Sequence, residues 1–190
     1  MGRWEPNARG RLEQAAMELY GERGYEQTTV TEIAKRAGLT ERTFFRHYAD
    51  KREVLFAGSA LLRERLVSGL AEAPPAAPPM DAVAAALQAA AAVFDERHAQ
   101  ARQRQRIITA NPELRERELV KLASLAAAMG EALRARGVSE PAASLAAEAG
   151  IAVFKVAFER WIDTTGVRGM GLFILEGLAG LESLMAGGRP

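Results

Sequence analysis

Apolar residues recur at intervals of three and four along almost the whole of this 190-residue chain. The first stripe is Leu12, Ala15, Ala16, Leu19 and Tyr20, and Gly24 follows it as a stop signal. This spacing places the apolar side chains on one face of an α-helix. No segment shows the alternation of apolar and polar residues that is typical of a β-strand. The sequence therefore predicts an all-α fold of about nine helices.

The segment "AEAPPAAPP" is the one linker-like break in this pattern. Proline cannot occupy the interior of a helix, because it lacks an amide donor and clashes with the preceding turn. We therefore expect a linker at residues 73–79, between a domain of residues 1–56, whose last helix continues as a connector to about residue 72, and a domain of residues 80–190. The helices expected in the second domain are roughly 80–98, 101–110, 112–136, 139–163 and 169–186.

The composition excludes several classes of function. The chain has no cysteine and two histidines, and it has no glycine-rich phosphate loop and no His/Glu spacing suited to a metal. Nothing orients Glu148, Lys155 or Trp161 for acid–base chemistry, so we expect neither an enzyme nor a metal or cofactor. The first residues lack the apolar core of a signal peptide, and no apolar run is long enough for a membrane helix, so we expect a cytoplasmic protein. A net charge of +1, with a mildly basic stretch at residues 1–52, does not by itself indicate nucleic-acid binding.

Residues 29–48 have the signals of two short helices joined by a turn. Thr29 and Glu32 form a capping box, in which each side chain satisfies a free amide of the other residue. Gly38 turns the chain and Thr40 caps the next helix, in which Phe44 and Tyr48 point inward. The arrangement is that of a helix-turn-helix, although any αα-corner has a similar pattern.

The outward side chains of this segment suit contact with DNA. Arg42 can donate two parallel bonds to guanine, whereas Thr43 and Phe45 suit a thymine methyl group or the sugar-phosphate wall. Hydroxyl and cationic groups can hold phosphates, and Arg3, Arg9 and Arg11 can add contacts from the start of the chain. The alternative is a charged, solvated face of a helical bundle. The candidate DNA-binding residues are Thr29, Thr31, Thr40, Glu41, Arg42, Thr43, Phe45, Arg46, His47 and Lys51.

Residues 9–56 closely resemble the DNA-binding domain of the TetR family of tetracycline-repressor-like regulators. The likeness rests on the run Ala15–Tyr20, the pairs Gly24-Tyr25 and Thr28-Thr29, the segment Ile33–Gly38 and the aromatic-rich segment Phe44–Lys51. The resemblance implies DNA contacts at Thr31, Lys51 and the outward residues of the second helix. One position departs from the pattern: Phe45 stands where the family usually has tyrosine, so the phosphate-bonding hydroxyl is missing.

The resemblance also implies an all-α homodimer whose C-terminal domain dimerises and binds a small molecule. Most members of the family are repressors. The last two helices expected here are apolar nearly all round, which requires burial on more than one side. Gly169, Gly171, Gly177 and Gly180 permit close approach of the backbone. A four-helix bundle across a two-fold axis explains both observations, and the alternative is that these helices form the core of a monomer.

The run "RQRQRIITANPELRERELVKLA" resembles the C-terminal domain of TetR-type regulators that bind acyl-CoA-like ligands. It implies a long apolar cavity with cations at its mouth, although alternate arginines do not share a helix face. Each candidate has a simpler interpretation as a core residue or as part of a solvated helix, and the spacing of four residues allows Lys155 to pair with Glu159 at the surface. Glu118 and His98 carry no separate signal. The candidate ligand-binding residues are Phe94, Arg102, Arg106, Leu122, Leu125, Met129, Phe154, Lys155, Phe158 and Trp161.

These observations lead to one hypothesis and one alternative. The hypothesis is a ligand-responsive repressor that binds a palindromic operator as a homodimer, with recognition helices about 34–36 Å apart. An acyl-CoA-like ligand would favour the state that does not bind DNA. The alternative is an architectural or protein-recruiting DNA-binding protein of the same fold that has no ligand. A closed C-terminal core favours the alternative, and a cavity favours the sensor.

Overall fold

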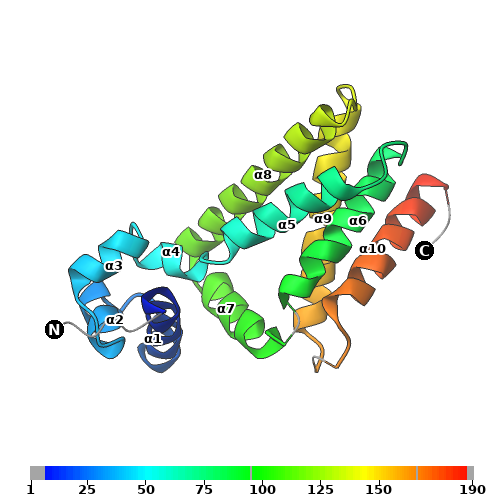
Figure 1. Cartoon of the computed structure of the whole chain (residues 1–190). Helices are drawn as coiled ribbons and strands as arrows, with labels where there is room; N and C mark the ends of the chain where they lie inside the picture. Colours follow the sequence, from blue (N-terminus) through cyan, green and yellow to red (C-terminus); the bar gives the residue numbers. More distant parts are fainter. Residues whose placement is uncertain (1–6, 95, 166, 188–190) are drawn as a thin grey trace. The chain divides into compact units, whose positions relative to one another are not determined.

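The computed structural model describes residues 7–94, 96–165 and 167–187. Every regular element among these residues is a helix, which confirms the all-α prediction (Figure 1). The α-helices are α1 (Ala8–Arg23), α2 (Val30–Arg36), α3 (Glu41–His47), α4 (Lys51–Leu55), α5 (Ser59–Glu72), α6 (Pro79–Ala91), α7 (His98–Ala110), α8 (Pro112–Ala135), α9 (Ala142–Ile162) and α10 (Met170–Met185), and a 3₁₀-helix, η1 (Ala92–Phe94), follows α6.

The described residues pack into two compact units. Unit 1 holds the chain up to Gly58 together with Gln103–Glu118, and unit 2 holds Ser59–Arg102 together with the chain from Leu119 onward. The C-terminal part of α7 and the first turns of α8 therefore belong with the N-terminal helices. Periodicity cannot reveal this grouping, because it says which face of a helix is buried and not what buries it.

Unit 1 is built around one hydrophobic cluster. Leu12 and Leu19 of α1, Ile33 of α2 and Phe44 of α3 are almost fully buried in it. Ile108, which lies far along the chain in α7, is completely buried in the same cluster. The stripe read from α1 is thus the core face, and Gly24 ends that helix with φ 85°, as predicted.

The helix predicted to run from residue 51 to about 72 is two helices, so the described residues contain ten α-helices where the sequence suggests about nine. The amides of Phe56 and Ala57 bond to carbonyls three residues back, which tightens the end of α4. The carbonyl of Leu55 accepts a hydrogen bond from the side chain of Arg104, and a glycine follows at position 58. The helical hydrogen-bond ladder is therefore interrupted between α4 and α5.

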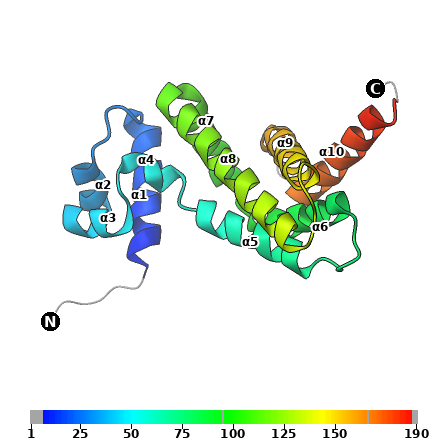
Figure 2. The same cartoon turned by 90° about the horizontal axis from the view of Figure 1, so that it is seen from above.

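In unit 2, α5 packs against α6, and α6 packs against both α9 and α10. α9 and α10 also lie side by side (Figure 2). Gly69 on α5 and Gly150 on α9 sit at close helix crossings. A Cβ atom on Gly69 would lie 2.7 Å from the Cα of Ala86, and one on Gly150 would lie 2.6 Å from Cγ1 of Val83. The core of unit 2 depends on these close approaches of the backbone.

The proline-rich segment, residues 73–79, turns the chain between α5 and α6 within unit 2. Arg136, just after α8, donates hydrogen bonds to the carbonyls of Leu70, Ala73 and Pro74 at 2.7–2.8 Å. This guanidinium satisfies carbonyls at the end of α5 that lack intrahelical donors. Prolines end α5 here as expected, and the segment is held to the body of the unit by Arg136.

Candidate nucleic-acid interface

α2 and α3 are joined by a turn that contains Gly38. Gly38 has φ 65°, in the left-handed region that glycine adopts without steric cost. The amide of Leu39 donates to the carbonyl of Ala34 at 2.8 Å and closes the end of α2. The side chain of Thr40 accepts from the amide of Thr43 and begins α3, which confirms the predicted cap. Local chemistry thus places both helices of the helix-turn-helix.

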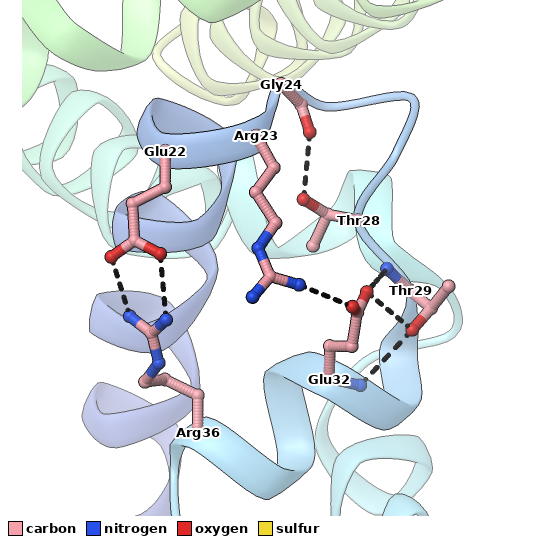
Figure 3. Close-up of polar contacts among 7 residues, drawn as sticks. All are labelled: Glu22, Arg23, Gly24, Thr28, Thr29, Glu32 and Arg36. Atoms are coloured by element: carbon pink, nitrogen blue, oxygen red, sulfur yellow. Dashed lines mark hydrogen bonds and ion pairs between the residues drawn. The ribbon is translucent and has the colours of Figure 1, made fainter.

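Charged contacts hold α2 against α1 (Figure 3). The predicted capping box is present, with Thr29 and Glu32 exchanging hydrogen bonds, and Arg23 adds a bond to Glu32 at 2.7 Å. Arg36 donates to both carboxylate oxygens of Glu22 at 2.8 and 2.9 Å. Hydrogen bonds from Thr29 hold the pKa of Glu32 below its usual range, and those from Arg36 do the same for the pKa of Glu22. The start and the end of α2 are therefore both tied to α1.

α3 has one buried face and one exposed face, as the sequence predicts. Phe44 is fully buried and Tyr48, which caps the helix, is buried beside it. Phe45 exposes 55% of its surface although its ring meets Phe44 edge-on at 5.5 Å. Within the described part of the chain, Arg42, Arg46 and His47 are exposed and have no hydrogen-bond or ion-pair partner. This face presents two guanidinium groups and an aromatic ring to solvent, and no hydrogen bond or ion pair from another described residue uses the cations.

The other candidate residues at the start of the two helices bond within the protein. Thr31 donates its hydroxyl to the Glu41 carboxylate at 2.7 Å, which links α2 with the first turn of α3. The hydroxyls of Thr40 and Thr43 lie 3.0 Å apart, and Thr43 is half-buried. The Thr29 hydroxyl is engaged in its capping box. The hydrogen bonds of these four threonines position α3, the expected recognition helix, and this role does not depend on a contact with DNA.

Lys51 has a different environment from the one its sequence position suggests. Its ammonium group donates to the carbonyls of Tyr25 and Thr28 at 2.9 Å each and of Glu26 at 3.2 Å. It also lies 4.3 Å from the centre of the Tyr25 ring. A lysine has three N–H donors, so all of them are satisfied by the loop between α1 and α2. The structure assigns Lys51 to holding this loop, and a phosphate contact would have to replace one of these bonds.

A polar network at the start of α1 has no signal in the sequence. Tyr48 donates its hydroxyl to Glu13 at 2.6 Å, and Nε of Arg9 lies 3.2 Å from both groups. Arg9 also donates from Nη2 to the carbonyl of Ala57 at 2.6 Å. Burial raises the pKa of Tyr48. Arg9 therefore ties α1 to the residues after α4. Of the other two early candidates, Arg11 is half-buried on α1 and Arg3 lies outside the described residues.

Arg104 of α7 anchors the end of α4. Its Nε donates to the carbonyl of Leu55 at 2.6 Å, and its guanidinium lies 5.1 Å from the centre of the Phe56 ring. Nη1 contacts Glu118 of α8 at 3.3 Å, and Gln105 donates to the second oxygen of the same carboxylate. Burial lowers the pKa of Arg104, and Glu118 opposes that effect. Glu118, which has no signal in the sequence, thus holds this arginine in place.

A second arginine joins α8 to α4. Arg117 donates to Oε1 of Glu53 from Nε at 2.7 Å and from Nη2 at 2.6 Å. Glu53 is also in the first turn of α4, where Asp50 accepts from its amide and from that of Arg52. α4 is therefore gripped near both ends, by Arg117 at its start and by Arg104 at its end.

Several of the predicted ligand-binding residues come together in unit 2. The Phe94 ring lies 5.5 Å from Phe158 and 5.9 Å from both Phe154 and Trp161. His98 meets the Trp161 ring edge-on at 4.8 Å, and its Nε2 lies 3.0 Å from the Trp161 carbonyl. These five residues from η1, α7 and α9 form what we call the aromatic cluster. Its rings fill one another's space, so a ligand would have to part them.

The remaining predicted ligand-binding residues are divided between core and surface. Leu125 and Met129 are buried in the core of unit 2, and Leu122 packs against it half-buried. Arg102, Arg106 and Lys155 are exposed, and they have no ionic partner among the described residues. The suggested pairing of Lys155 with Glu159 is thus not seen.

α9 and α10 leave apolar side chains uncovered. The exposed large residues on these helices are Leu145 and Val156 of α9 and Leu172, Leu175, Leu184 and Met185 of α10. Two of the glycines on α10 serve packing inside unit 2, because a Cβ on Gly171 would meet Gln88 at 2.8 Å and one on Gly177 would meet Val153 at 3.1 Å. A Cβ on Gly180 would meet nothing within 4 Å. The outer face of α10 is therefore open and carries uncovered apolar side chains next to the exposed Glu176 and Glu182.

Two absences concern the described residues only. They hold no group of three or more histidine, cysteine or carboxylate side chains placed to bind a metal ion. No helix among them combines the length and the hydropathy needed to span a membrane.

Two family models match the chain. The model described as "Bacterial regulatory proteins, tetR family" matches residues 13–57, which contain most of α1 and all of α2, α3 and α4. The model described as "MftR C-terminal domain" matches residues 77–186, more than half of the chain. The helix-turn-helix described above lies entirely within the first match.

Individual relatives agree with these matches. The HTH-type transcriptional regulator TcmR of Streptomyces glaucescens is 37% identical over 81 residues, which are 43% of this chain and 36% of that protein. The chain thus matches about a third of this relative's length. Thermus thermophilus FadR, a repressor solved with lauroyl-CoA, is 26% identical with a TM-score of 0.50 over 93% of this chain and 94% of its own. Bacillus subtilis FadR, solved with stearoyl-CoA, has a TM-score of 0.60 at 22% identity over 95% of this chain and 99% of its own.

Proposed function

The chain belongs to the TetR family of bacterial regulatory proteins, and we propose that it is a repressor that binds a palindromic operator as a homodimer and leaves it when an acyl-CoA-like effector binds. It is a transcriptional regulator and not an enzyme, like the relatives it matches. The operator, the dimer, the repressing action and the effector are the proposed parts.

The outward face of α3 is the observation that carries the DNA interface. Arg42 lies in the first turn of α3, the part of a recognition helix that meets base edges in the major groove. Its free guanidinium can donate two bonds to guanine, and the exposed Phe45 ring suits a thymine methyl group. Arg46 and His47 are free to contact phosphates. Glu41, held by Thr31, is left with one carboxylate oxygen that can accept from cytosine.

The apolar outer face of α10 supports the homodimer. Leu172 and Leu175 are about half exposed there, and Val156 adds to the same kind of surface on α9. Gly180 leaves room for a partner helix to approach closely. A two-fold axis would bring the same apolar surface of a second copy against this one and bury both. Two recognition helices would then reach successive major grooves of one operator.

The effector proposal rests on a relative and on the aromatic cluster. Thermus thermophilus FadR was solved with lauroyl-CoA, and its likeness covers nearly the whole chain. In this protein, Phe154, Phe158 and Trp161 offer an apolar environment suited to an acyl chain. Arg102, exposed on α7 in the same unit, carries positive charge of the kind that the phosphates of a CoA group require, whereas Arg106 belongs to unit 1.

α7 offers a route by which the effector can act on DNA binding. His98 in its first turn touches Trp161 of the aromatic cluster, and Arg104, six residues later, holds Leu55 at the end of α4. Six residues of helix span about 9 Å. An acyl chain that parts the aromatic cluster would shift the start of α7 and disturb the grip of Arg104 on α4. The effector then needs only to prefer this disturbed state.

Fluorescence anisotropy on DNA from upstream of the protein's own gene tests the proposal, across salt concentrations and with or without lauroyl-CoA. We expect specific, salt-dependent binding that lauroyl-CoA reverses. Arg42→Ala should lose about 1–3 kcal/mol of discrimination against random DNA, while the matched control Arg63→Ala, on α5, should not. Specific binding that ignores lauroyl-CoA would reject this effector class and favour the ligand-independent factor. An Arg42→Ala protein with unchanged affinity and specificity would refute the proposed reading of DNA by α3.

A further inference from the structure

Unit 2 has a groove on its surface that none of the predicted ligand-binding residues lines. It measures about 560 Å³ and lies between α5 and the residues of α6 and η1, with Glu96 and Arg97 at its edge. This volume is within the range of small-molecule sites, roughly 300–1,000 Å³. It is separate from the aromatic cluster, since Phe94 and Trp161 do not line it.

The groove follows from the side chains on two facing helix stripes. Leu61 and Arg65 are four residues apart on α5 and therefore share a face. Ala89, Ala92 and Val93 form the facing stripe on α6 and η1. α5 and α6 pack closely, so larger residues at the two alanine positions would fill the space between them. The two methyl groups leave a hollow with an apolar floor.

Arg65 and Arg97 bring two positive charges to this floor. Both are exposed, and within the described part of the chain neither guanidinium has a hydrogen-bond or ion-pair partner. Glu96 lines the same groove and has φ 62°, a left-handed conformation that is uncommon for any residue but glycine. With two cations and one carboxylate, the groove has a net charge of +1. It suits a singly charged anion better than the several phosphates of an acyl-CoA.

We propose that this groove binds a small amphiphilic monocarboxylate. The planar guanidinium groups of Arg65 and Arg97 match the geometry of a carboxylate, which they can bind with paired hydrogen bonds. The apolar part of the ligand lies along Leu61, Val93 and the alanine methyl groups, which are otherwise left in contact with water. The groove is thus a second ligand site, independent of the one proposed for acyl-CoA and of whether the protein represses.

Calorimetric titration of the full-length protein with octanoate tests the site, and octanamide serves as the neutral probe of the same shape. We expect octanoate to bind once per chain and octanamide to bind at least about tenfold more weakly, because it cannot form charge-assisted bonds. Arg65→Gln and Arg97→Gln should each weaken octanoate binding roughly ten- to hundredfold. The matched control Arg63→Gln changes an exposed arginine of α5 that does not line the groove, and it should bind octanoate like wild type.

A second pair of variants tests the shape of the groove. Ala89→Leu should fill the hollow and abolish binding of octanoate, whereas Ala85→Leu, one turn earlier on α6 and also exposed, should leave it intact. The proposal is overturned if octanoate does not bind, if both arginine variants bind it like wild type, or if octanamide binds equally well. No DNA is present in these titrations, so a failure of the proposed repressor function would not affect the result.

Discussion

Lys51 is the residue whose proposed role the structure changes most, and Lys51→Met tests that change. Methionine keeps an unbranched stem of similar length but removes the ammonium group. The substitution therefore leaves the carbonyls of Tyr25, Glu26 and Thr28 without their donor and removes the cation from the Tyr25 ring. The loop between α1 and α2, which precedes the helix-turn-helix, loses its main polar contact with α4.

The size of the effect follows from these contacts. Hydrogen bonds to charged groups contribute about 1.5–3 kcal/mol each when well buried. Here two bonds are partly buried and the third is exposed, so the low end applies. The cation–π contact adds about 0.5–1 kcal/mol. Two partly buried bonds at about 1.5 kcal/mol each, together with the cation–π contact, give an expected fall of about 3.5–4 kcal/mol in the free energy of unfolding, to which the exposed bond adds little.

Urea unfolding followed by circular dichroism measures the loss, and DNA binding across salt concentrations separates the two roles of Lys51. The matched control is Lys35→Met, on the exposed surface of α2, which should change stability by less than about 0.5 kcal/mol. If Lys51 instead binds a phosphate directly, Lys51→Met should unfold like wild type and reduce the salt dependence of DNA binding by about one unit. That pair of results would refute our assignment.

Three further predictions concern unit 1. Phe45→Tyr should restore a phosphate-bonding hydroxyl and strengthen DNA binding by about 0.5–1.5 kcal/mol, as measured by anisotropy. The pKa of Glu22 is lowered in the folded protein by Arg36, so its contribution to stability is present above its ordinary pKa of 4.5 and is lost as pH falls through the lowered value. Arg36→Gln should therefore make stability depend less steeply on pH below 4.5 in acid titrations followed by circular dichroism. Arg104→Met should lower the free energy of unfolding by about 1–3 kcal/mol, because the Leu55 carbonyl loses its donor from Arg104 and the Glu118 carboxylate keeps only its bond from Gln105, and urea unfolding will measure it.

Each of these three predictions has a result that would contradict it. Phe45→Tyr with weakened binding would mean that the ring packs against an apolar part of DNA. An Arg36→Gln protein with the wild-type pH profile would show that this exposed pair contributes nothing to stability. For Arg104→Met the control is Arg102→Met, an exposed arginine of the same helix, and equal stability of the two would contradict the proposed grip on α4.

The sequence by itself determined the features that depend on neighbours within about four residues. Thr29 with Glu32, Thr40 as a cap and the inward pair Phe44 and Tyr48 all follow from helix geometry and from the need of free amides for partners. The exposed face of α3 follows too, since burying one face of a helix leaves the other to solvent. The Phe45 departure could likewise be read directly from the sequence.

Only the tertiary structure decided which distant groups meet. Lys51 bonds to carbonyls 23–26 residues away, Arg104 reaches Leu55 across 49 residues, and Arg117 reaches Glu53 across 64. Each of these side chains is long and positively charged, and it could equally well lie in solvent or against a phosphate. The periodicity of the sequence does not distinguish these positions. Free backbone carbonyls at a loop and at a helix end select the partners of Lys51 and Arg104, and a carboxylate selects that of Arg117; the positions of these acceptors exist only once the chain has folded.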